Sequence, residues 1–191
     1  MDVRDAFFYG LYDLAQKDKN VILLTADMGA LALEKFQCDF PDRFINVGIA
    51  EQNLIGVATG LSMMGKKVYV YGIASFVIYR CLDQIRCDLV EMNLPVTIIG
   101  AGVGLSYGSD GASHHALYDL LIMRQFPNVT ILTPHNAEES QQAVKMSYES
   151  DHPVYVRLSK GELPMNYGSW RDYCTNAPFI VEGKKNNVLD G

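Results

Sequence analysis

The sequence has few charged residues, no long apolar run and no clustered basic segment. Charged residues form 20% of the 191 positions, and the formal net charge is -6. This share is below the usual value of about a quarter, which indicates that a partner covers part of the surface. The basic residues are scattered, so we expect no nucleic-acid partner. No apolar stretch reaches the ~20 residues that span a bilayer, so we also expect no membrane partner.

Disulfide and secretion signals are also missing. The four cysteines, Cys38, Cys81, Cys87 and Cys174, form no CxxC pair, and the N-terminal segment lacks the layout of a signal peptide. We therefore expect reduced thiols and a cytoplasmic location. A chain of this length predicts one domain.

Several common site motifs are absent as well. The sequence contains no GxxxxGK[ST] phosphate loop, no GxSxG nucleophile elbow, and no dinucleotide fingerprint after its first expected strand. Asp110, His114 and His115 form the one cluster of metal-ligand type. Because adjacent histidines at a helix start point in different directions, we expect no metal site in this chain.

Short β-rich runs alternate with segments of helical spacing. The expected strands are 21–25, 44–47, 67–71, 96–100, 129–133 and 154–158. The expected helices are 4–16, 50–63, 77–91, 116–124 and 137–148. Such alternation predicts a doubly wound α/β fold, with a mostly parallel sheet of about six strands and helices on both faces.

Ligands of such folds bind beyond the carboxyl ends of the strands. The loops expected there are 26–31, 48–51, 72–76 and 102–115. The last is the longest and richest in glycine, which is typical of a functional loop.

One acid stands out at this edge. Glu51 lies within NVGIAEQNLIG, between apolar residues and at the start of an expected helix. It is either a first-turn acid favoured by the helix dipole, worth about 0.3–1 kcal/mol, or a carboxyl in an apolar pocket that exchanges a proton with a bound heterocycle. Its neighbours leave similar alternatives open. Phe76 is a core aromatic or a stacking face, Asp27 is a turn residue or a site residue, and Asp110 and His114 belong to a polar loop or to a site.

Three segments in this order resemble motifs of a known family. DRFINVGIAEQNLIGVATGLS, SFVIYRCLDQIR and DGASHHALYDLLIMRQFPNVTILTPHNAEE are similar to the pyrimidine-binding domain of the transketolase family, whose enzymes use thiamine diphosphate. PVYVRLSKGELP resembles the last strand of that domain and its basic turn. The resemblance implies a pyrimidine-binding domain over residues 1–164, as in the C-terminal section of a split transketolase. It makes residues 165–191 a linker or tail leading towards an absent C-terminal domain.

The resemblance also implies roles at the cofactor. Glu51 becomes the catalytic glutamate, which hydrogen-bonds N1′ of the aminopyrimidine and promotes its imino tautomer. Phe76 would stack on the pyrimidine, with Tyr79 and Arg80 nearby and Asp27 close to the cofactor. The carbanion chemistry belongs to the cofactor, whereas the protein supplies position and electrostatics.

Four further positions correspond to substrate contacts in the family. Asp110 and the catalytic residue His114 would meet the hydroxyls or the carbonyl of a ketose. Arg4 and Lys160 fall where the family places cations for a sugar phosphate.

Departures from the family pattern affect the substrate. Ser113 and His115 replace Thr and Gln of the DGPTHQ loop, and Gly102 and Leu31 stand where transketolases commonly have His and Ser. Recognition of phosphate, and therefore of pentose phosphates, is an open question at this point.

The family's GDG motif, which binds the diphosphate and its metal ion, is missing from the sequence. The resemblance therefore implies half of an active site. A diphosphate-binding partner, the N-terminal section of a split transketolase, would hold magnesium or calcium, in a homodimer or a heterotetramer.

Three functions remain open from sequence. The first is a component of a transketolase-like enzyme that transfers a two-carbon ketol unit between sugars. The second keeps the cofactor but acts as a deoxyxylulose-phosphate synthase-like or 2-oxo acid dehydrogenase beta-like subunit. The third is a non-catalytic binding domain with the same fold.

Overall fold

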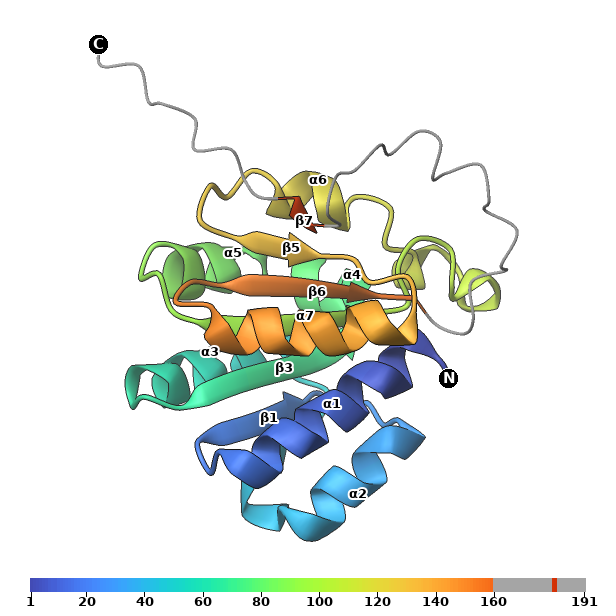
Figure 1. Cartoon of the computed structure of the whole chain (residues 1–191). Coiled ribbons are helices and arrows are strands. Elements are labelled where there is room, and N and C mark those ends of the chain that lie inside the picture. Colours follow the sequence, from blue (N-terminus) through green and yellow to red (C-terminus); the bar gives the residue numbers. More distant parts are fainter. Residues whose placement is uncertain (160–179, 182–191) are drawn as a thin grey trace.

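A computed structural model describes residues 1–159 and 180–181, which form a sheet between two layers of helices (Figure 1). The strand order is β2-β1-β3-β4-β6-β5-β7. The strands are β1 (Val21–Thr25), β2 (Phe44–Asn46), β3 (Lys67–Ile73), β4 (Val96–Ala101), β5 (Thr130–Leu132), β6 (Val154–Leu158) and β7 (Ile180–Val181). Strands β1 to β6 pair in parallel, which confirms the expected fold.

Helices connect the strands and cover both faces of the sheet. The α-helices are α1 (Val3–Lys17), α2 (Leu31–Asp39), α3 (Glu51–Met63), α4 (Ala74–Tyr79), α5 (Leu82–Gln84), α6 (Asp119–Met123) and α7 (Ala137–Glu149). A π-helix, η2 (Ile85–Val90), follows α5, and the 3-10 turns are η1 (Pro41–Arg43), η3 (Gly108–Asp110) and η4 (Ala112–His114). Polar caps begin two of the helices, because the side chains of Asp2 and Asn136 accept the backbone N–H groups of Arg4 and Glu139.

The two faces of the sheet have different cores. Helices α1, α2 and α7 lie together on the face nearer the viewer in Figure 1 and bury aromatic side chains such as Phe8 and Tyr71, whose ring centroids are 4.7 Å apart. Helix α3, helix α4 and η2 cover the other face with aliphatic residues such as Leu54, Ile78 and Ile85. Each fully buried side chain of this size contributes roughly 1.5–3 kcal/mol.

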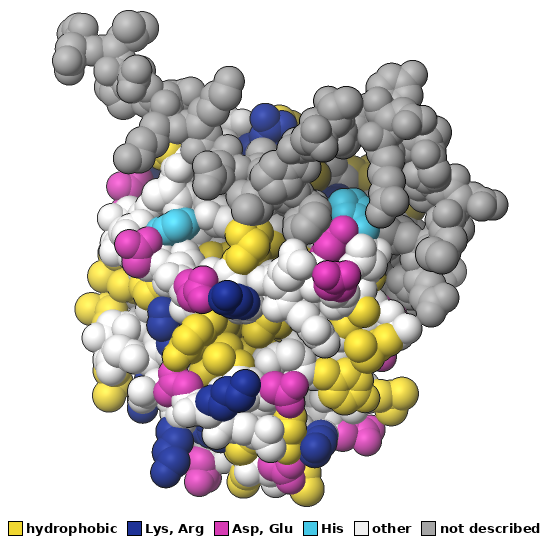
Figure 2. Space-filling view, in the orientation of Figure 1, with side chains coloured by type: hydrophobic (Ala, Val, Ile, Leu, Met, Phe, Trp, Pro, Cys, Tyr) yellow, Lys and Arg dark blue, Asp and Glu magenta, His cyan; other side chains and the backbone are white. Residues whose placement is uncertain are grey.

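Basic and acidic side chains are mixed on the surface, as the scattered basic residues of the sequence predict. Figure 2 shows dark blue and magenta side chains interspersed over the face that carries α1 and α7. Within residues 1–159 and 180–181, every helix is too short or too polar to cross a membrane.

Some expected elements differ from the structure. Helix α2 is absent from the sequence-based expectation, because only Ala32, Leu33 and Phe36 among its residues are buried and its apolar spacing is therefore short. The sequence predicts one helix over 77–91, because its apolar spacing continues without a break. The structure instead divides this stretch into α4, α5 and η2, with an interruption at Cys81. Strand β7, which pairs antiparallel with β5, falls within 165–191, where the sequence predicts a linker or tail.

Candidate active site

Glu51 is the first residue of α3, at the carboxyl edge of the sheet. Gly48 has a φ of +76°, a conformation that favours glycine, and its carbonyl accepts the N–H of Ala50 at 2.8 Å. This turn leaves the Glu51 side chain only 9% exposed, with Leu54 and Ile55 buried in the core behind it. The expected apolar setting of this acid is therefore present.

Arg80 gives this acid a counter-charge. Arg80 Nη1 lies 3.5 Å from Glu51 Oε2, and its carbonyl accepts a hydrogen bond from Gln52 Nε2 at 3.0 Å. Beside the pair is an open hollow of about 490 Å³. Its lining residues are Ile49, Ala50, Glu51, Gln52, Asn53 and Arg80.

Cys81 lies on the buried side of this acid. Burial, and next the negative charge of Glu51, raise the pKa of the Cys81 thiol to about 12, although Arg80 opposes the shift. The thiol therefore stays protonated at neutral pH and packs as a small apolar group.

Phe76 joins the acid to the glycine-rich loop. The Arg80 guanidinium carbon lies 3.8 Å from the centroid of the Phe76 ring, and the His114 ring lies 4.9 Å from the same ring at an angle of 61°. Glu51, Arg80, Phe76 and His114 thus form one continuous row of contacts. The structure brings together four of the residues predicted from the sequence.

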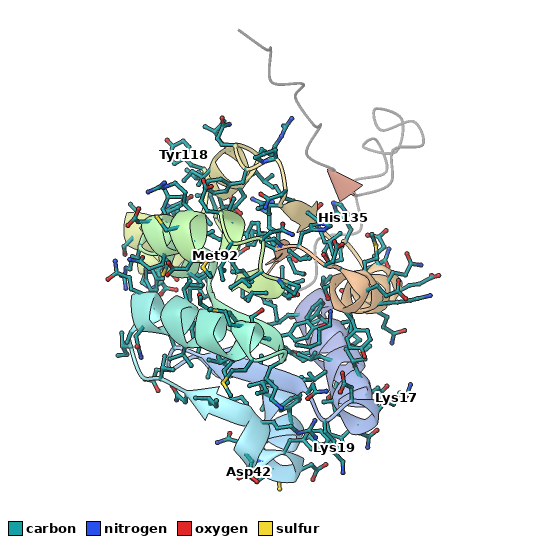
Figure 3. All side chains as sticks on the ribbon, turned by 90° about the vertical axis from the view of Figure 1, so that its left-hand side faces the viewer. Lys17, Lys19, Asp42, Met92, Tyr118 and His135 are labelled. Atoms are coloured by element: carbon teal, nitrogen blue, oxygen red, sulfur yellow. The ribbon has the colours of Figure 1, made fainter. Side chains whose placement is uncertain are left out.

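Two hydrogen bonds fasten α4 to the loop. Tyr79 Oη accepts the N–H of Tyr118 at 2.7 Å, and Ser75 Oγ donates to the carbonyl of Ser113 at 2.9 Å. Tyr118 lies at the α6 end of the molecule (Figure 3). The Tyr79 hydroxyl is therefore engaged with the loop. Ser75 and Tyr118 are absent from the predicted site residues, because an isolated Ser or Tyr gives no sequence signal of such contacts.

Asp27 has a strained backbone at the end of β1. Its φ is +55°, in the left-handed region that is uncommon for residues other than glycine. Asn46 Oδ1 accepts the N–H groups of both Asp27 and Gly48, at 3.0 and 2.9 Å, and Asn46 Nδ2 donates to Asp27 Oδ1 at 3.3 Å. Asn46, which has no motif of its own in the sequence, thereby links Asp27 to the turn that leads into Glu51.

In the loop between β4 and α6, Asp110 is exposed and His114 is half-buried. Ser113 Oγ lies 3.1 Å from His114 Nδ1, and the Tyr107 ring lies 5.9 Å from the His114 ring. Gly102 has a φ of +75°, and a Cβ added there would lie 1.8 Å from Tyr107 Cε2. Tyr107 thus fills the space that a side chain at Gly102 would need, so a histidine at this position would require the Tyr107 ring to move.

Arg4 lies on α1, on the opposite face of the sheet from α3. Its Nε and Nη2 atoms each lie 3.2 Å from Asp5 Oδ1. Burial raises the pKa of both Tyr71 and Tyr107, and the charge of Arg4 opposes the shift in each. Arg4 is therefore near Tyr107 and the loop, whereas Lys160 lies outside the described residues.

The described residues fit one end of thiamine diphosphate. A buried carboxylate with a hollow beside it suits an aminopyrimidine, and Phe76 is the aromatic ring nearby, on the far side of the Arg80 guanidinium. Within residues 1–159, no cluster of three metal-ligating side chains is present that would hold the ion of a diphosphate.

Comparison with known proteins connects this site to a family. Residues 1–166 match the family model described as the transketolase pyrimidine-binding domain. An apulose-4-phosphate transketolase subunit of Phocaeicola vulgatus is 37% identical over 98% of this chain and 59% of its own length. A putative transketolase C-terminal section of Methanocaldococcus jannaschii is 34% identical over 99% of this chain and 58% of its own.

A solved structure and a second kind of relative complete the comparison. A split-gene transketolase, described as an inactive beta4 tetramer, has a TM-score of 0.76 and 35% identity over 86% of this chain and 53% of its own. The 1-deoxy-D-xylulose-5-phosphate synthase of Halothermothrix orenii is 40% identical over 93% of this chain and 27% of its own. The chain spans less than two thirds of each of these relatives. From the matched domain and its fold, the chain belongs to the transketolase family through its pyrimidine-binding domain.

Proposed function

We propose that this chain is a component of a thiamine diphosphate-dependent enzyme that transfers a two-carbon ketol unit between sugars. The observation that carries the proposal is the row of contacts from Glu51 through Arg80 and Phe76 to His114. It joins an acid, a stacking ring and an imidazole at one edge of the sheet.

Each residue of the row has a task when the cofactor is bound. Glu51 holds a proton at N1′ of the aminopyrimidine, and Phe76 provides a face for that ring. Arg80, with Tyr79 behind it and Asp27 at the neighbouring turn, sets the limits of the pocket. The cofactor supplies the stabilised carbanion.

The sugar is held from the loop side. His114 and Asp110 donate to and accept from the carbonyl and hydroxyl groups of a ketose, and His114 acts as a catalytic acid or base. Two relatives carry names of transketolase subunits for a sugar phosphate and for a sulfo sugar, namely apulose-4-phosphate and 6-deoxy-6-sulfo-D-fructose. An anionic ketose therefore suits this site, with Arg4 and Lys160 as the cationic contacts.

A second subunit completes the site. We assign the diphosphate, with its magnesium or calcium ion, to an N-terminal section subunit that pairs with residues 1–164 in a cytoplasmic heterotetramer. Residues 165–191 would lead towards a C-terminal domain. The beta4 tetramer of the solved relative is described as inactive, which supports the need for a different partner chain.

The test is ketol transfer after mixing this chain with a diphosphate-binding subunit. Glu51→Gln removes the ionisable group and keeps the shape, so it is expected to lower kcat at least about 100-fold. Glu34→Gln is the matched control, because Glu34 is also a first-turn acid of a helix and is exposed. Undiminished transfer by Glu51→Gln would overturn the assignment.

A second function has one observation in its favour. The 40% identity with a deoxyxylulose-phosphate synthase exceeds the 37% identity with a transketolase subunit. A substrate comparison separates the two functions, since pyruvate is the donor expected for the synthase or for a 2-oxo acid dehydrogenase beta-like subunit. Decarboxylation of pyruvate with inert ketoses would favour this alternative, and a folded mixture inert towards both would favour a non-catalytic domain.

A further inference from the structure

A buried charged cluster lies at the start of α6, away from the groups that the proposed chemistry uses. The Asp119 carboxylate is fully buried. Asp119 Oδ2 accepts hydrogen bonds from Tyr155 Oη at 2.8 Å and from Arg157 Nε at 2.6 Å, and Arg157 Nη2 lies 3.3 Å from Oδ1. Tyr155 and Arg157 are on β6, 36 and 38 residues further along the chain. The cluster therefore fixes the first residue of α6 to the middle of the sheet.

The neighbouring strand β4 leaves space for the Tyr155 side chain. Gly100 of β4 leaves room for the Tyr155 ring, because a Cβ at Gly100 would lie 2.8 Å from both Cε2 and Oη of Tyr155. Burial, and next the charge of Asp119, raise the pKa of Tyr155, so the phenol stays protonated and donates its hydrogen bond. A buried carboxylate without partners is costly, so Asp119 has one well-determined position.

Strand β6 also holds the other end of the loop. The N–H of Gly102 donates to the carbonyl of Leu158 at 2.9 Å. Within the loop, Gly104 and Ala116 form an antiparallel bridge with N···O distances of 3.0 and 2.9 Å. Residues 102–118 thus form a closed loop whose two ends are fastened to the same strand.

The anchored end continues directly to the candidate active site. Tyr118 precedes Asp119 and donates its N–H to Tyr79 Oη at 2.7 Å. Tyr79 belongs to α4, the helix that carries Phe76, and the Phe76 ring contacts His114 at 4.9 Å. A displacement of Asp119 would therefore move the loop relative to α4.

We propose that Asp119, held by Arg157 and Tyr155, is a positioning residue that sets His114 against α4. Asp119 acts through the loop, whose ends it and Leu158 fix to β6. Its effect on turnover rests on the proposed function, whereas its effect on the loop does not.

The first experiment measures amide hydrogen exchange in Asp119→Asn. This variant keeps the size of the side chain but removes the charge that pairs with Arg157. We expect exchange in residues 102–118 to accelerate at least about tenfold while β1 and β3 keep their protection. Val144→Ala is the control, since Val144 is buried on the α1 and α7 side and its truncation should leave the loop unchanged. Normal loop protection in Asp119→Asn, or equal loss in the control, would overturn the proposal.

A double variant keeps the test decisive if Asp119→Asn folds poorly. Replacing both partners, as Asp119→Leu with Arg157→Met, removes the buried pair without leaving an unpaired charge, and such exchanges are often neutral for stability. We expect an unfolding temperature close to that of the unaltered chain together with fast exchange in residues 102–118. Restored stability with restored loop protection would show that the pair only stabilises the fold.

The functional experiment uses the chain mixed with its diphosphate-binding subunit. For the double variant we expect the KM for the ketose to rise at least about tenfold, because small displacements of positioning groups carry large costs. The thiamine diphosphate concentration that gives half-maximal activity should change less than about twofold, since Glu51 and Phe76 remain in place. Equal changes in the KM for the ketose and in the half-maximal thiamine diphosphate concentration would contradict a positioning role. If the unaltered chain transfers no ketol unit, the proposed function fails, and the exchange measurements still decide the role of Asp119.

Discussion

Arg80 Nη1 lies 3.5 Å from Glu51 Oε2 while the same guanidinium covers the Phe76 ring, with its central carbon 3.8 Å from the ring centroid. A single planar cation therefore contacts both the acid and the aromatic ring of the candidate site. The Arg80 side chain is 49% exposed, so solvent weakens the ion pair.

We expect Arg80→Met to lower the free energy of unfolding by roughly 1–2 kcal/mol, because it removes the ion pair with the buried Glu51 and the cation–π contact with Phe76, each worth about 1 kcal/mol or less at a half-exposed arginine. Arg80→Lys keeps the charge and loses the flat stacking surface, so its loss should be intermediate. Urea denaturation measures both, with the exposed Arg124→Met as control. A lower free energy of unfolding for Arg80→Lys than for Arg80→Met would contradict this assignment of the loss to charge and stacking.

Removal of the Asn46 side chain should loosen the turns on either side of it. Asn46→Ala loses three hydrogen bonds to Asp27 and Gly48, each worth roughly 0.5–1.5 kcal/mol, and solvent replaces part of this because Asn46 is exposed. We expect a loss of about 1–2 kcal/mol by urea denaturation. Asn46→Asp keeps the acceptor for both N–H groups but puts a second carboxylate beside Asp27, so a higher salt concentration should recover part of its loss. A loss in Asn46→Asp that does not depend on salt would rule out this explanation.

A side chain at Gly102 should displace the Tyr107 ring. We expect Gly102→Ala to lower the melting temperature by roughly 5–15 °C, because an overpacked core costs about 1–3 kcal/mol and the positive φ adds to this. Combining Gly102→Ala with Tyr107→Leu relieves the overlap and leaves only the backbone strain. Calorimetry of Gly102→Ala, Tyr107→Leu and the double variant tests this, and a double variant no more stable than the sum of the two single changes would contradict the overlap.

Alkaline pH should destabilise the fold partly through Cys81. Burial raises the pKa of this thiol from an ordinary value of 9.0 to about 12, so the unfolded chain releases the proton first. The stability that Cys81 contributes is complete below pH 9 and is lost as the pH rises from 9 towards 12. Cys81→Ala should therefore show a shallower decline above pH 9 than the unaltered chain, whatever its stability at pH 7. Urea denaturation between about pH 7 and 11 gives both slopes, and identical slopes would disprove this contribution.

The sequence predicted the elements whose signal is local. The runs at 21–25 and 154–158 are buried on both faces of the sheet. A continuous run of apolar, β-branched residues is enough to predict such a strand. Glu51 was identifiable because an acid between apolar residues at a helix start is conspicuous. The grouping of Phe76 and His114 required only the rule that parallel strands end at the same edge.

The remaining features depend on contacts between distant segments. Asp119 and Arg157 are ordinary charged residues in sequence, and only the placement of β6 beside β4 brings them together. The overlap of Tyr107 with Gly102 depends on the path of the loop, and the two hydrogen bonds of Asn46 Oδ1 depend on how β1 and β2 pair. Patterns of apolar spacing carry no information on such pairings.

The position of β6 has a consequence for how the chain acquires its site during synthesis. β6 is inserted between β4 and β5, although it is the last of the six parallel strands to leave the ribosome. Residues 102–118 therefore cannot take their final path until Leu158 has emerged, although α3 and α4 are synthesised long before it. A nascent chain is expected to close the sheet and arrange residues 102–118 in the same late event.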